Sequence, residues 1–388
     1  MEKISLRGIA LLYPRGYSNA EGKSLGEVLN PNRSKTFIET FHPGWSGVPL
    51  GTGGVAIATL FDPLPGSSFD TQLGTGLVAL ALLFLLPILL ISATRLLKHK
   101  KAFLEDLANP GSGALFGTLP AAMLVIALDL AQLGIDGKIS KDFAAKLAFS
   151  LALTGILLAL GIGFAFFSRV INNEEFPVAA ISGAWFIPVV VLVLAPSTFI
   201  RTERLLESTS LNIVFVLSVA LWGAGFFLFI FLAGVVAWRL ITTPTPPAHM
   251  AATWFIWLAP FSAGALGLIA IFRWSAEIFN FTGSNMDQAN ALGMMAGLSL
   301  WGIGTWWLAF AILQVMRMRR QLHFHIGSWG FSFPLAAYTA LSLELGRMTQ
   351  LNEISNYASS VWIILLGIWF ILIQKTIMGV ISRSIFSR

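Results

Sequence analysis

Few residues of this 388-residue chain combine types and spacing that could do chemistry. The sequence contains no cysteine, which excludes disulfides, thiol catalysis and thiolate metal sites. His323 and His325 lie one residue apart in a basic stretch, but two histidines without a third ligand are weak evidence for a metal site. Asp129, Glu277 and Glu344 could act as acids or bases, yet no histidine or metal-binding cluster accompanies them. These patterns predict a protein that is not an enzyme and that holds no cofactor or metal.

The strongest pattern in the sequence is a set of prolines at a nearly constant period. Their separations are 71, 68, 72 and 74 residues, and the set consists of Pro49, Pro120, Pro188, Pro260 and Pro334. A proline inside a helix removes one backbone hydrogen bond and kinks the helix. In lipid, such broken backbone is tolerated only where protein or a water-filled cavity covers it. We therefore predict five proline-kinked helices that form an inner ring around a central pore.

The composition indicates that these helices lie in a lipid bilayer. Hydrophobic residues make up 56% of the chain and charged residues only 11%, whereas a soluble domain has about 25% charged residues. The mean hydropathy is +0.76. These values exclude a soluble enzyme, a nucleic-acid-binding protein and a disordered scaffold.

Apolar stretches of roughly 20 residues, the length that crosses a bilayer as helix, divide the chain into predicted spans. The ten spans are 46–61, 74–97, 114–133, 143–168, 180–200, 210–240, 250–272, 290–316, 327–346 and 356–380. Each odd-numbered span carries one of the five prolines. The expected fold is thus an all-α membrane protein of five tandem helical hairpins, with the odd spans inside and the even spans outside. The expected domains are a cytoplasmic N-terminal segment (1–45), the transmembrane domain (46–380) and a cytoplasmic tail (381–388).

The basic residues predict the orientation of the chain. With ten spans, both termini lie on one side of the membrane, and that side holds 18 of the 25 lysines and arginines. Basic residues accumulate in cytoplasmic loops. We therefore expect a multi-pass protein of the cytoplasmic (plasma) membrane with both termini in the cytoplasm.

The side chains near the prolines are apolar or hydroxylic. The possible pore-lining residues are Thr52, Thr118, Ser182, Ser262, Ser332 and Phe331. No ionisable side chain falls in the middle of an odd span, whereas a proton-coupled carrier usually places one at membrane depth. Charged residues reappear toward the outer ends of these spans, where they could form a vestibule for ions or anchor the helices at the interface. The charged residues at those ends are Asp129, Arg201, Glu203, Arg204, Arg273, Glu277, Glu344 and Arg347.

Three motifs resemble a known family. The run from Phe41 to Gly54 is similar to the first-helix signature of the tellurite-resistance/dicarboxylate transporter family, which includes malate and sulfite carriers and the slow-type anion channels of plants. Residues 115–120 resemble its third helix, and residues 329–335, Trp-Gly-Phe-Ser-Phe-Pro-Leu, resemble its ninth. One departure is Asn109, which stands where the family commonly has histidine before the third helix.

The resemblance implies a homotrimer in which each protomer has its own pore, occluded by a phenylalanine of the ninth helix that corresponds to Phe333. It leaves three hypotheses open. The first is an anion channel for small inorganic or carboxylate anions. The second is a proton- or ion-coupled carrier of malate (a C4-dicarboxylate), sulfite or tellurite-related anions. The third is a membrane enzyme or sensor, which would need a bound cofactor.

Overall fold

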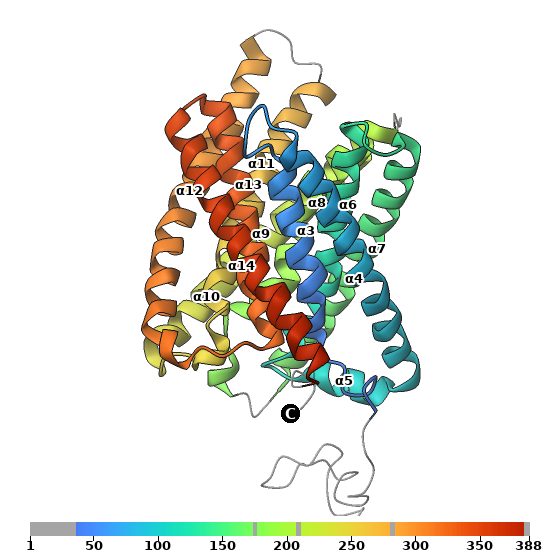
Figure 1. The fold of residues 1–388 in the computed structure, drawn as a ribbon, viewed down its shortest axis with the longest axis vertical. Coiled ribbons are helices and arrows are strands. Elements are labelled where there is room, and N and C mark those ends of the chain that lie inside the picture. The colour runs from blue at the N-terminus through green and yellow to red at the C-terminus, as the bar shows by residue number, and fades with distance from the viewer. Residues whose placement is uncertain (1–35, 174–176, 207–210, 280–283, 384–388) are drawn as a thin grey trace, which may run out of the picture.

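The computed structural model describes residues 36–173, 177–206, 211–279 and 284–383. Most of the predicted segment 1–45 and of the tail 381–388 lies outside these residues. Within them the chain is almost entirely helical, and its long helices stand side by side along one common direction (Figure 1). The prediction of an all-α fold is confirmed.

Two sets of helices alternate along the chain. The inner helices, each with the short turn before it, are η1 and α3 (Pro43–Ser46, Gly47–Leu60), η2 and α6 (Gly113–Gly117, Thr118–Ile135), η4 and α8 (Gly183–Phe186, Ile187–Leu206), α10 and α11 (Thr253–Ile256, Leu258–Ile278), and η7 and α13 (Ile326–Phe331, Ser332–Thr349). The outer helices are α4 (Phe69–Lys98), α7 (Lys141–Ile171), α9 (Leu211–Thr242), α12 (Ser284–Met318) and α14 (Asn352–Ile381). The connections contain α5 (Lys100–Ala108), η3 (Val178–Ala180), η5 (Ala248–Met250) and η6 (Arg319–Gln321).

The periodic prolines lie in the first turn of each inner α-helix. They are the second residue of α8 and the third residue of α3, α6, α11 and α13. The first turn leaves its N–H groups unpaired in any case, so a proline there costs little. A separate short helical turn precedes each proline, and the α-helix begins one or two residues before it, so each proline lies near the junction of two helical segments and not in the middle of one long helix. Among the described helices, the interior prolines are instead Pro87 of α4 and Pro196 of α8.

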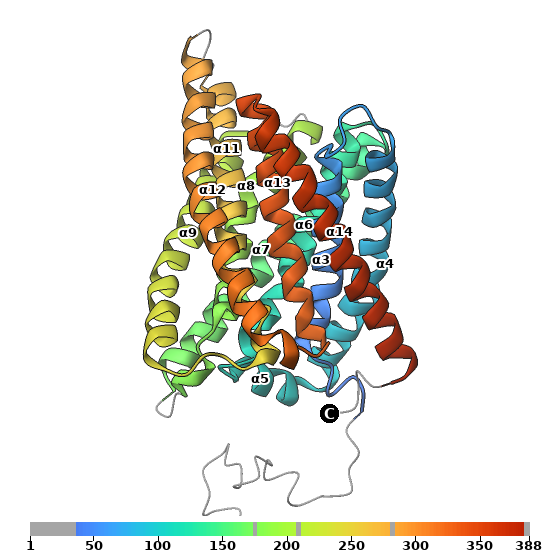
Figure 2. The ribbon, with the colours of Figure 1, turned by 60° about the vertical axis from the view of Figure 1, so that its left-hand side comes forward.

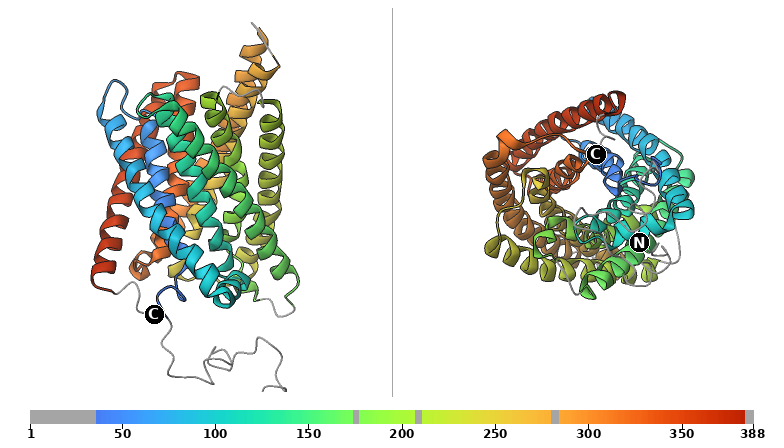
Figure 3. Two further views of the ribbon diagram at one scale, coloured as in Figure 1. Left: turned by 90° about the vertical axis from the view of Figure 1, so that its right-hand side faces the viewer. Right: turned by 90° about the horizontal axis from the view of Figure 1, so that it is seen from below.

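The inner helices form a closed ring. Each contacts its two neighbours in the order α3, α6, α8, α11, α13 and back to α3. Every outer helix packs against the inner helix that precedes it in the chain and also against the next one, and α14 closes the circle by contacting α3. Figure 3 shows the outer helices encircling the inner ones when the bundle is viewed from its end. Figure 2 shows α12, α13, α3 and α14 side by side where the two ends of the chain meet.

Among the residues that the structure describes, eight helical segments are long and apolar enough to cross a membrane. They are Phe69–Lys98, Gly113–Ile135, Lys141–Ile171, Gly183–Leu206, Asn212–Thr242, Ala248–Ile278, Asn285–Gln321 and Asn352–Ile381. The most apolar 18-residue window is 94% buried in Gly183–Leu206 but only 17% buried in Asn212–Thr242, which distinguishes an inner from an outer helix. The other two inner helices fall outside this set: α3 has only 14 residues, and α13 carries Glu344 and Arg347.

Tryptophans of the outer helices are hydrogen-bonded to the inner ring. Their indole N–H groups donate over 2.9–3.2 Å in four pairs: Trp362 to Thr59 Oγ1, Trp369 to Thr52 Oγ1, Trp222 to the Gly264 carbonyl, and Trp301 to Ser342 Oγ. Lipid offers an indole no acceptor, so these donors favour the positions where the inner helices provide one. The bonds thereby fix how the outer helices lie against the ring.

Gly225→Ala in α9 is expected to destabilise the protein, because a Cβ there would lie 2.8 Å from both Val189 O and Leu192 Cβ of α8. Overpacking of this kind costs about 1–3 kcal/mol. Gly223→Ala, two residues earlier, is the matched control, since nothing lies within 4 Å of its Cβ and alanine favours helix more than glycine does. Thermal unfolding in detergent measures the difference, and an equal Tm for the two variants would contradict the close packing of α8 and α9.

Candidate functional site

The inner helices begin on the side of the bundle where α5 lies (Figure 1). Side chains cap the first turns of η1, η4 and η7, and Asn109 makes the same kind of bond in the turn between α5 and η2. In each case the side chain of one residue accepts the backbone N–H two residues later. The pairs are His42 Nδ1 with Gly44 N at 3.1 Å, Asn109 Oδ1 with Gly111 N at 2.8 Å, Ser182 Oγ with Ala184 N at 3.3 Å, and His325 Nδ1 with Gly327 N at 3.1 Å. Such caps satisfy donors that the start of a helix leaves free.

These caps give a role to residues that sequence reasoning set aside. Asn109 departs from the family pattern, but its amide oxygen accepts the backbone N–H two residues later, as the rings of His42 and His325 do, in the turn between α5 and η2. The signal was present in the sequence as an acceptor followed two residues later by glycine, in His42-Pro-Gly, Asn109-Pro-Gly and His325-Ile-Gly. His325 is thus a helix cap. Among the described residues, no group of three or more His, Asp or Glu side chains is arranged to hold a metal ion.

Phe333, the expected gate, is the second residue of α13 and is 6% exposed. It lies against α3, where a Cβ built on Gly54 would come within 3.2 Å of Phe333 Cδ2. Gly51 similarly makes room for Trp329 and Ser332. The glycines of α3 therefore bring the first and last inner helices close together beside Phe333.

The hydroxyl groups predicted to line the pore have other partners in most cases. Thr52 Oγ1 donates to Val48 O and accepts from Trp369 of the outer ring. Thr118 Oγ1 lies 2.6 Å from Leu115 O and 3.2 Å from Pro43 O, and Ser332 Oγ donates to Gly51 O at 3.2 Å. The Ser262 hydroxyl is buried without a partner among the described residues. These contacts join neighbouring helices to one another.

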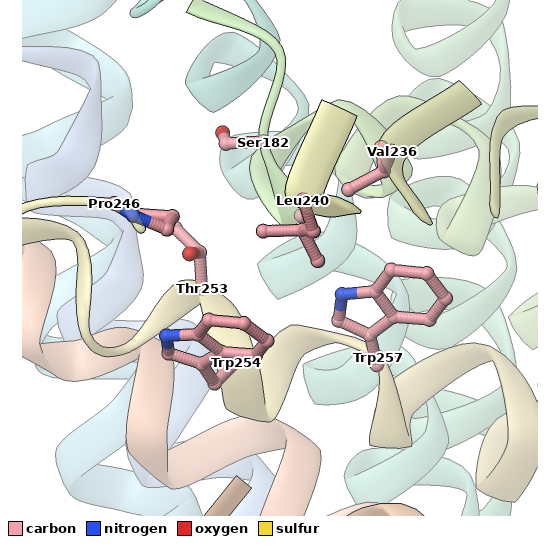
Figure 4. Close-up of a pocket in the computed structure, with 8 residues that line it drawn as sticks. Ser182, Val236, Leu240, Pro246, Thr253, Trp254 and Trp257 are labelled. Atoms are coloured by element: carbon pink, nitrogen blue, oxygen red, sulfur yellow. The ribbon is translucent and has the colours of Figure 1, made fainter. Parts of the chain in front are cut away.

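The remaining two predicted lining residues border cavities. Ser182 lies on a void of about 10 Å³ between α10 and the end of α9, with Trp254 and Trp257 on its wall (Figure 4). This void has room for about one water molecule. Phe331 borders a larger cavity of about 350 Å³, which is mostly apolar and also touches His323, His325 and Lys375. Phe333 borders neither cavity.

The opposite ends of the inner helices bring charged side chains together. Arg201 lies within electrostatic range of Glu344 and three further arginines. We call this group the arginine vestibule; its members are Arg201, Arg204, Arg273, Arg347, Glu277 and Glu344. Four arginines against two glutamates leave a formal charge of +2 (4 − 2). Six of the eight charged residues found at these helix ends in the sequence thus lie together.

Ion pairs and an aromatic ring organise the vestibule. Glu344 is nearly buried and lies 2.6 Å from Arg273 Nη1 and 3.5 Å from Arg347 Nη1. Arg204 pairs with Glu277. Arg347 also donates to the carbonyl of Phe61, at the end of α3.

Arg201 differs from the other three arginines because no described carboxylate pairs with it. Its Nε donates to Gln132 Oε1 at 3.0 Å, and its guanidinium lies 5.1 Å from the centroid of the Phe61 ring. The guanidinium of Arg347 lies at the same distance from that ring. Two positive groups therefore share one aromatic ring, which attracts cations through its electron-rich face.

Two of the charged residues grouped with the vestibule in the sequence lie apart from it. Asp129 is fully buried in α6, where it faces Gly53 of α3, and neither of its carboxylate oxygens has a hydrogen-bond partner among the described residues. Glu203 is 3% exposed, and its Oε2 is also without a partner there. A linear sequence shows that a residue is near a helix end but not which neighbour it faces.

The closed inner ring, the apolar outer helices and the charged mouth define a multi-pass membrane transport protein. The family of voltage-dependent anion channels, SLAC1, matches residues 40–377. The chain belongs to this family. It is therefore a membrane protein of anion channels and transporters and not an enzyme, and the family resemblance of its sequence motifs is confirmed.

Relatives along the chain include transporters with named substrates. An uncharacterised transporter of Methanocaldococcus jannaschii is 27% identical over 90% of this chain and 96% of its own length. A sulfite efflux pump of Trichophyton rubrum is 24% identical over 96% of this chain and 98% of its own length. A malic acid transport protein of Schizosaccharomyces pombe is 21% identical over 54% of this chain and 49% of its own length.

Acid is expected to weaken the cap at His325. Burial, and then the neighbouring His249, lower the pKa of His325, so its ring is neutral and Nδ1 accepts from Gly327. The stability from this cap is complete above the ordinary histidine pKa and is lost as the pH falls through the lowered value. His325→Asn provides an amide oxygen as the acceptor, like that of Asn109 for Gly111, without a titrating group, and it should remove up to about 1 kcal/mol of the acid-induced loss. His323→Asn, in the same loop, is the control. Thermal unfolding across a pH series checks this, and equal acid sensitivity of wild type and His325→Asn would overturn it.

Removing the positive charge of Arg201 is expected to lower anion flux. Arg201→Gln should reduce uptake into liposomes severalfold at low ionic strength, and the difference should shrink as salt screens the mouth. Lys146→Gln removes the same charge from an outer helix, where Lys146 is 71% exposed and paired with Asp142, and it should have little effect. A loss of flux that is equal in both variants or independent of salt would count against an electrostatic role of the vestibule.

Proposed function

We propose that this protein conducts small anions across the cell membrane through the axis of its inner ring, as an anion channel gated by Phe333. The observation that carries this proposal is the closed ring of five helices with an arginine vestibule at one mouth, in a chain of the voltage-dependent anion channel family. The permeant ions are small inorganic or carboxylate anions.

The proposal includes ten membrane crossings arranged as five tandem hairpins. Helix α3 by itself is too short to cross a membrane, and α13 by itself is too polar. Both gain length from the helical turns that precede them. With η1, α3 is about 29 Å long, close to the hydrocarbon thickness of about 30 Å, and α13 with η7 is longer. The transmembrane domain is then 46–380, flanked by segments 1–45 and 381–388.

The orientation follows from the basic residues. The start of the inner helices faces the cytoplasm together with both termini, because that side holds 18 of the 25 lysines and arginines. The arginine vestibule then opens to the outside of the cell. We also propose a homotrimer with one pore in each protomer, which rests on the family resemblance.

The charges of the vestibule fit the passage of an anion. The carboxyl ends of the inner helices carry partial negative charge, which would repel an anion. The arginines offset this potential at the mouth, while the ring further along lacks an arginine or lysine that would hold the ion. Weak binding is what a pore needs for rapid release.

Phe333 suits the role of a gate by its size and its place. The residues at the same position before the other four prolines are smaller, namely Val48, Leu119, Ile187 and Ala259. Because Gly54 brings α3 against the ring of Phe333, a small displacement of either helix would change the space beside the ring.

A coupled carrier is the second candidate function. The specific observation that favours it is Asp129, a buried carboxyl group inside the inner ring, because such groups bind the protons that drive secondary transport. The full-length similarity to sulfite efflux pumps favours sulfite as its substrate, and malate (a C4-dicarboxylate) or tellurite-related anions are further candidates.

Phe333→Ala is expected to raise anion flux about tenfold or more, since it removes the ring from the path. Purified protein in liposomes is assayed for conductance with chloride, nitrate, sulfite and malate, and the reversal potentials identify the permeant ion. The control is Phe227→Ala in α9, whose side chain is 67% exposed on the outer surface. Unchanged conductance in a well-folded Phe333→Ala protein would contradict the gate. Uptake that requires a proton gradient and occurs without ohmic current would contradict the channel hypothesis and support the coupled carrier.

A further inference from the structure

Asp129 is the most unusual ionisable residue of the inner ring. It is the twelfth residue of α6, and its exposed fraction is 0%. Neither carboxylate oxygen has a hydrogen-bond partner among the described residues. A Cβ built on Gly53 of α3 would lie 3.0 Å from Asp129 Oδ2, so the carboxyl group is held between two neighbouring helices of the ring.

Charged groups of the surrounding elements do not reach this carboxyl group. The charged residues on the helices packed against α6 are Asp70, Arg95 and Lys98 of α4, Lys141, Asp142, Lys146 and Arg169 of α7, and Arg201, Glu203 and Arg204 of α8, whereas α3 has none. Among the described residues, none of these forms an ion pair with Asp129. The nearest polar side chain on its own helix, one turn on, is Gln132, which is bonded to Arg201 and Asp136.

The surroundings therefore fit the protonated form of the group. A carboxylate that is buried without a partner is strongly unfavourable, whereas a neutral carboxyl is tolerated. Ionisation breaks the O–H bond, passes the proton to water and leaves a carboxylate that needs hydrogen bonds. Water can supply them only if the contact between α3 and α6 opens.

Opening that contact moves the helix that packs against the gate. Gly53 touches Asp129, and the next residue, Gly54, lies against Phe333 and Ala336 of α13. Because glycine places no side chain between the helices, a shift of α3 at Gly53 is passed directly to the ring of Phe333.

We propose that Asp129 is a proton-binding site that sets the position of α3 against Phe333, so that anion flux depends on pH. This inference rests on the proposed function. With the proton bound, α3 packs against α6 and Phe333 as in this structure, and flux is low. Loss of the proton moves α3 outward from between α6 and α13, which opens the contacts at both Gly53 and Gly54 and raises flux.

The test measures anion flux into liposomes between about pH 5 and about pH 9. Wild-type flux is expected to rise about threefold or more over this range. Asp129→Asn, a neutral isostere, should hold flux at the wild-type value of low pH throughout. The control, Asp142→Asn, changes an exposed aspartate of the adjacent α7, and its pH profile should match the wild type. An unaltered pH profile in Asp129→Asn would overturn the proposal.

A second variant tests whether the proton acts through the gate. Phe333→Ala should abolish the pH dependence while flux stays high, because no ring remains to be displaced. A pH dependence that persists in Phe333→Ala would overturn this route.

The infrared carboxyl band separates failure of this inference from failure of the proposed function. A buried protonated carboxyl gives its own C=O band, which Asp129→Asn should lack. Loss of that band supports the proton site even if wild-type protein transports no anion, and an identical spectrum in both proteins overturns it.

Discussion

Lipid supplies no hydrogen bonds, so each polar group of the inner ring has to find its partner within the protein. This constraint explains where the polar side chains lie. Caps such as His42 and His325 satisfy the first N–H groups of the turns that begin inner helices, and indoles of the outer helices, such as Trp362 and Trp369, bond to inner-ring hydroxyls. Most of the hydroxyl groups that the sequence suggests as pore lining are therefore hydrogen-bonded within the bundle and help to hold the ring together.

Helix α3 is where the ring is most tightly packed. One stripe of its glycines, Gly47, Gly51 and Gly54, faces α13 and the turn before it, and Gly53 faces α6. The first inner helix therefore approaches both neighbours without side chains of its own between them. Such a contact has little capacity to absorb a displacement by side-chain rearrangement, because there are no rotamers to change. A movement of α3 therefore changes its contacts with both α6 and α13.

The sequence predicted the positions of the long helices well, because their apolar length and the proline period are local properties. Helices α4 and α14, for example, match the predicted spans 74–97 and 356–380 within a few residues, apart from an earlier start of α4. The short α5 and the caps were missed because they contribute little hydropathy. The direction of a side chain could not be predicted, since it depends on the helix rotation and on partners far away in the chain. Thr52 thus bonds to Trp369, 317 residues later, and Asp129 lies against α3 instead of in the vestibule.

The vestibule shows why charge counts alone mislead at a pore mouth. Its formal charge of +2 suggests an anion trap, but five helix carboxyl ends contribute about half a negative charge each. The two contributions nearly cancel, and Glu344 is itself enclosed by Arg273 and Arg347. What remains for an incoming anion is the local field of Arg201, whose guanidinium has no carboxylate partner among the described residues. Under the proposed function, a mouth of this kind would attract an anion at close range without holding it, which is the balance that conduction requires.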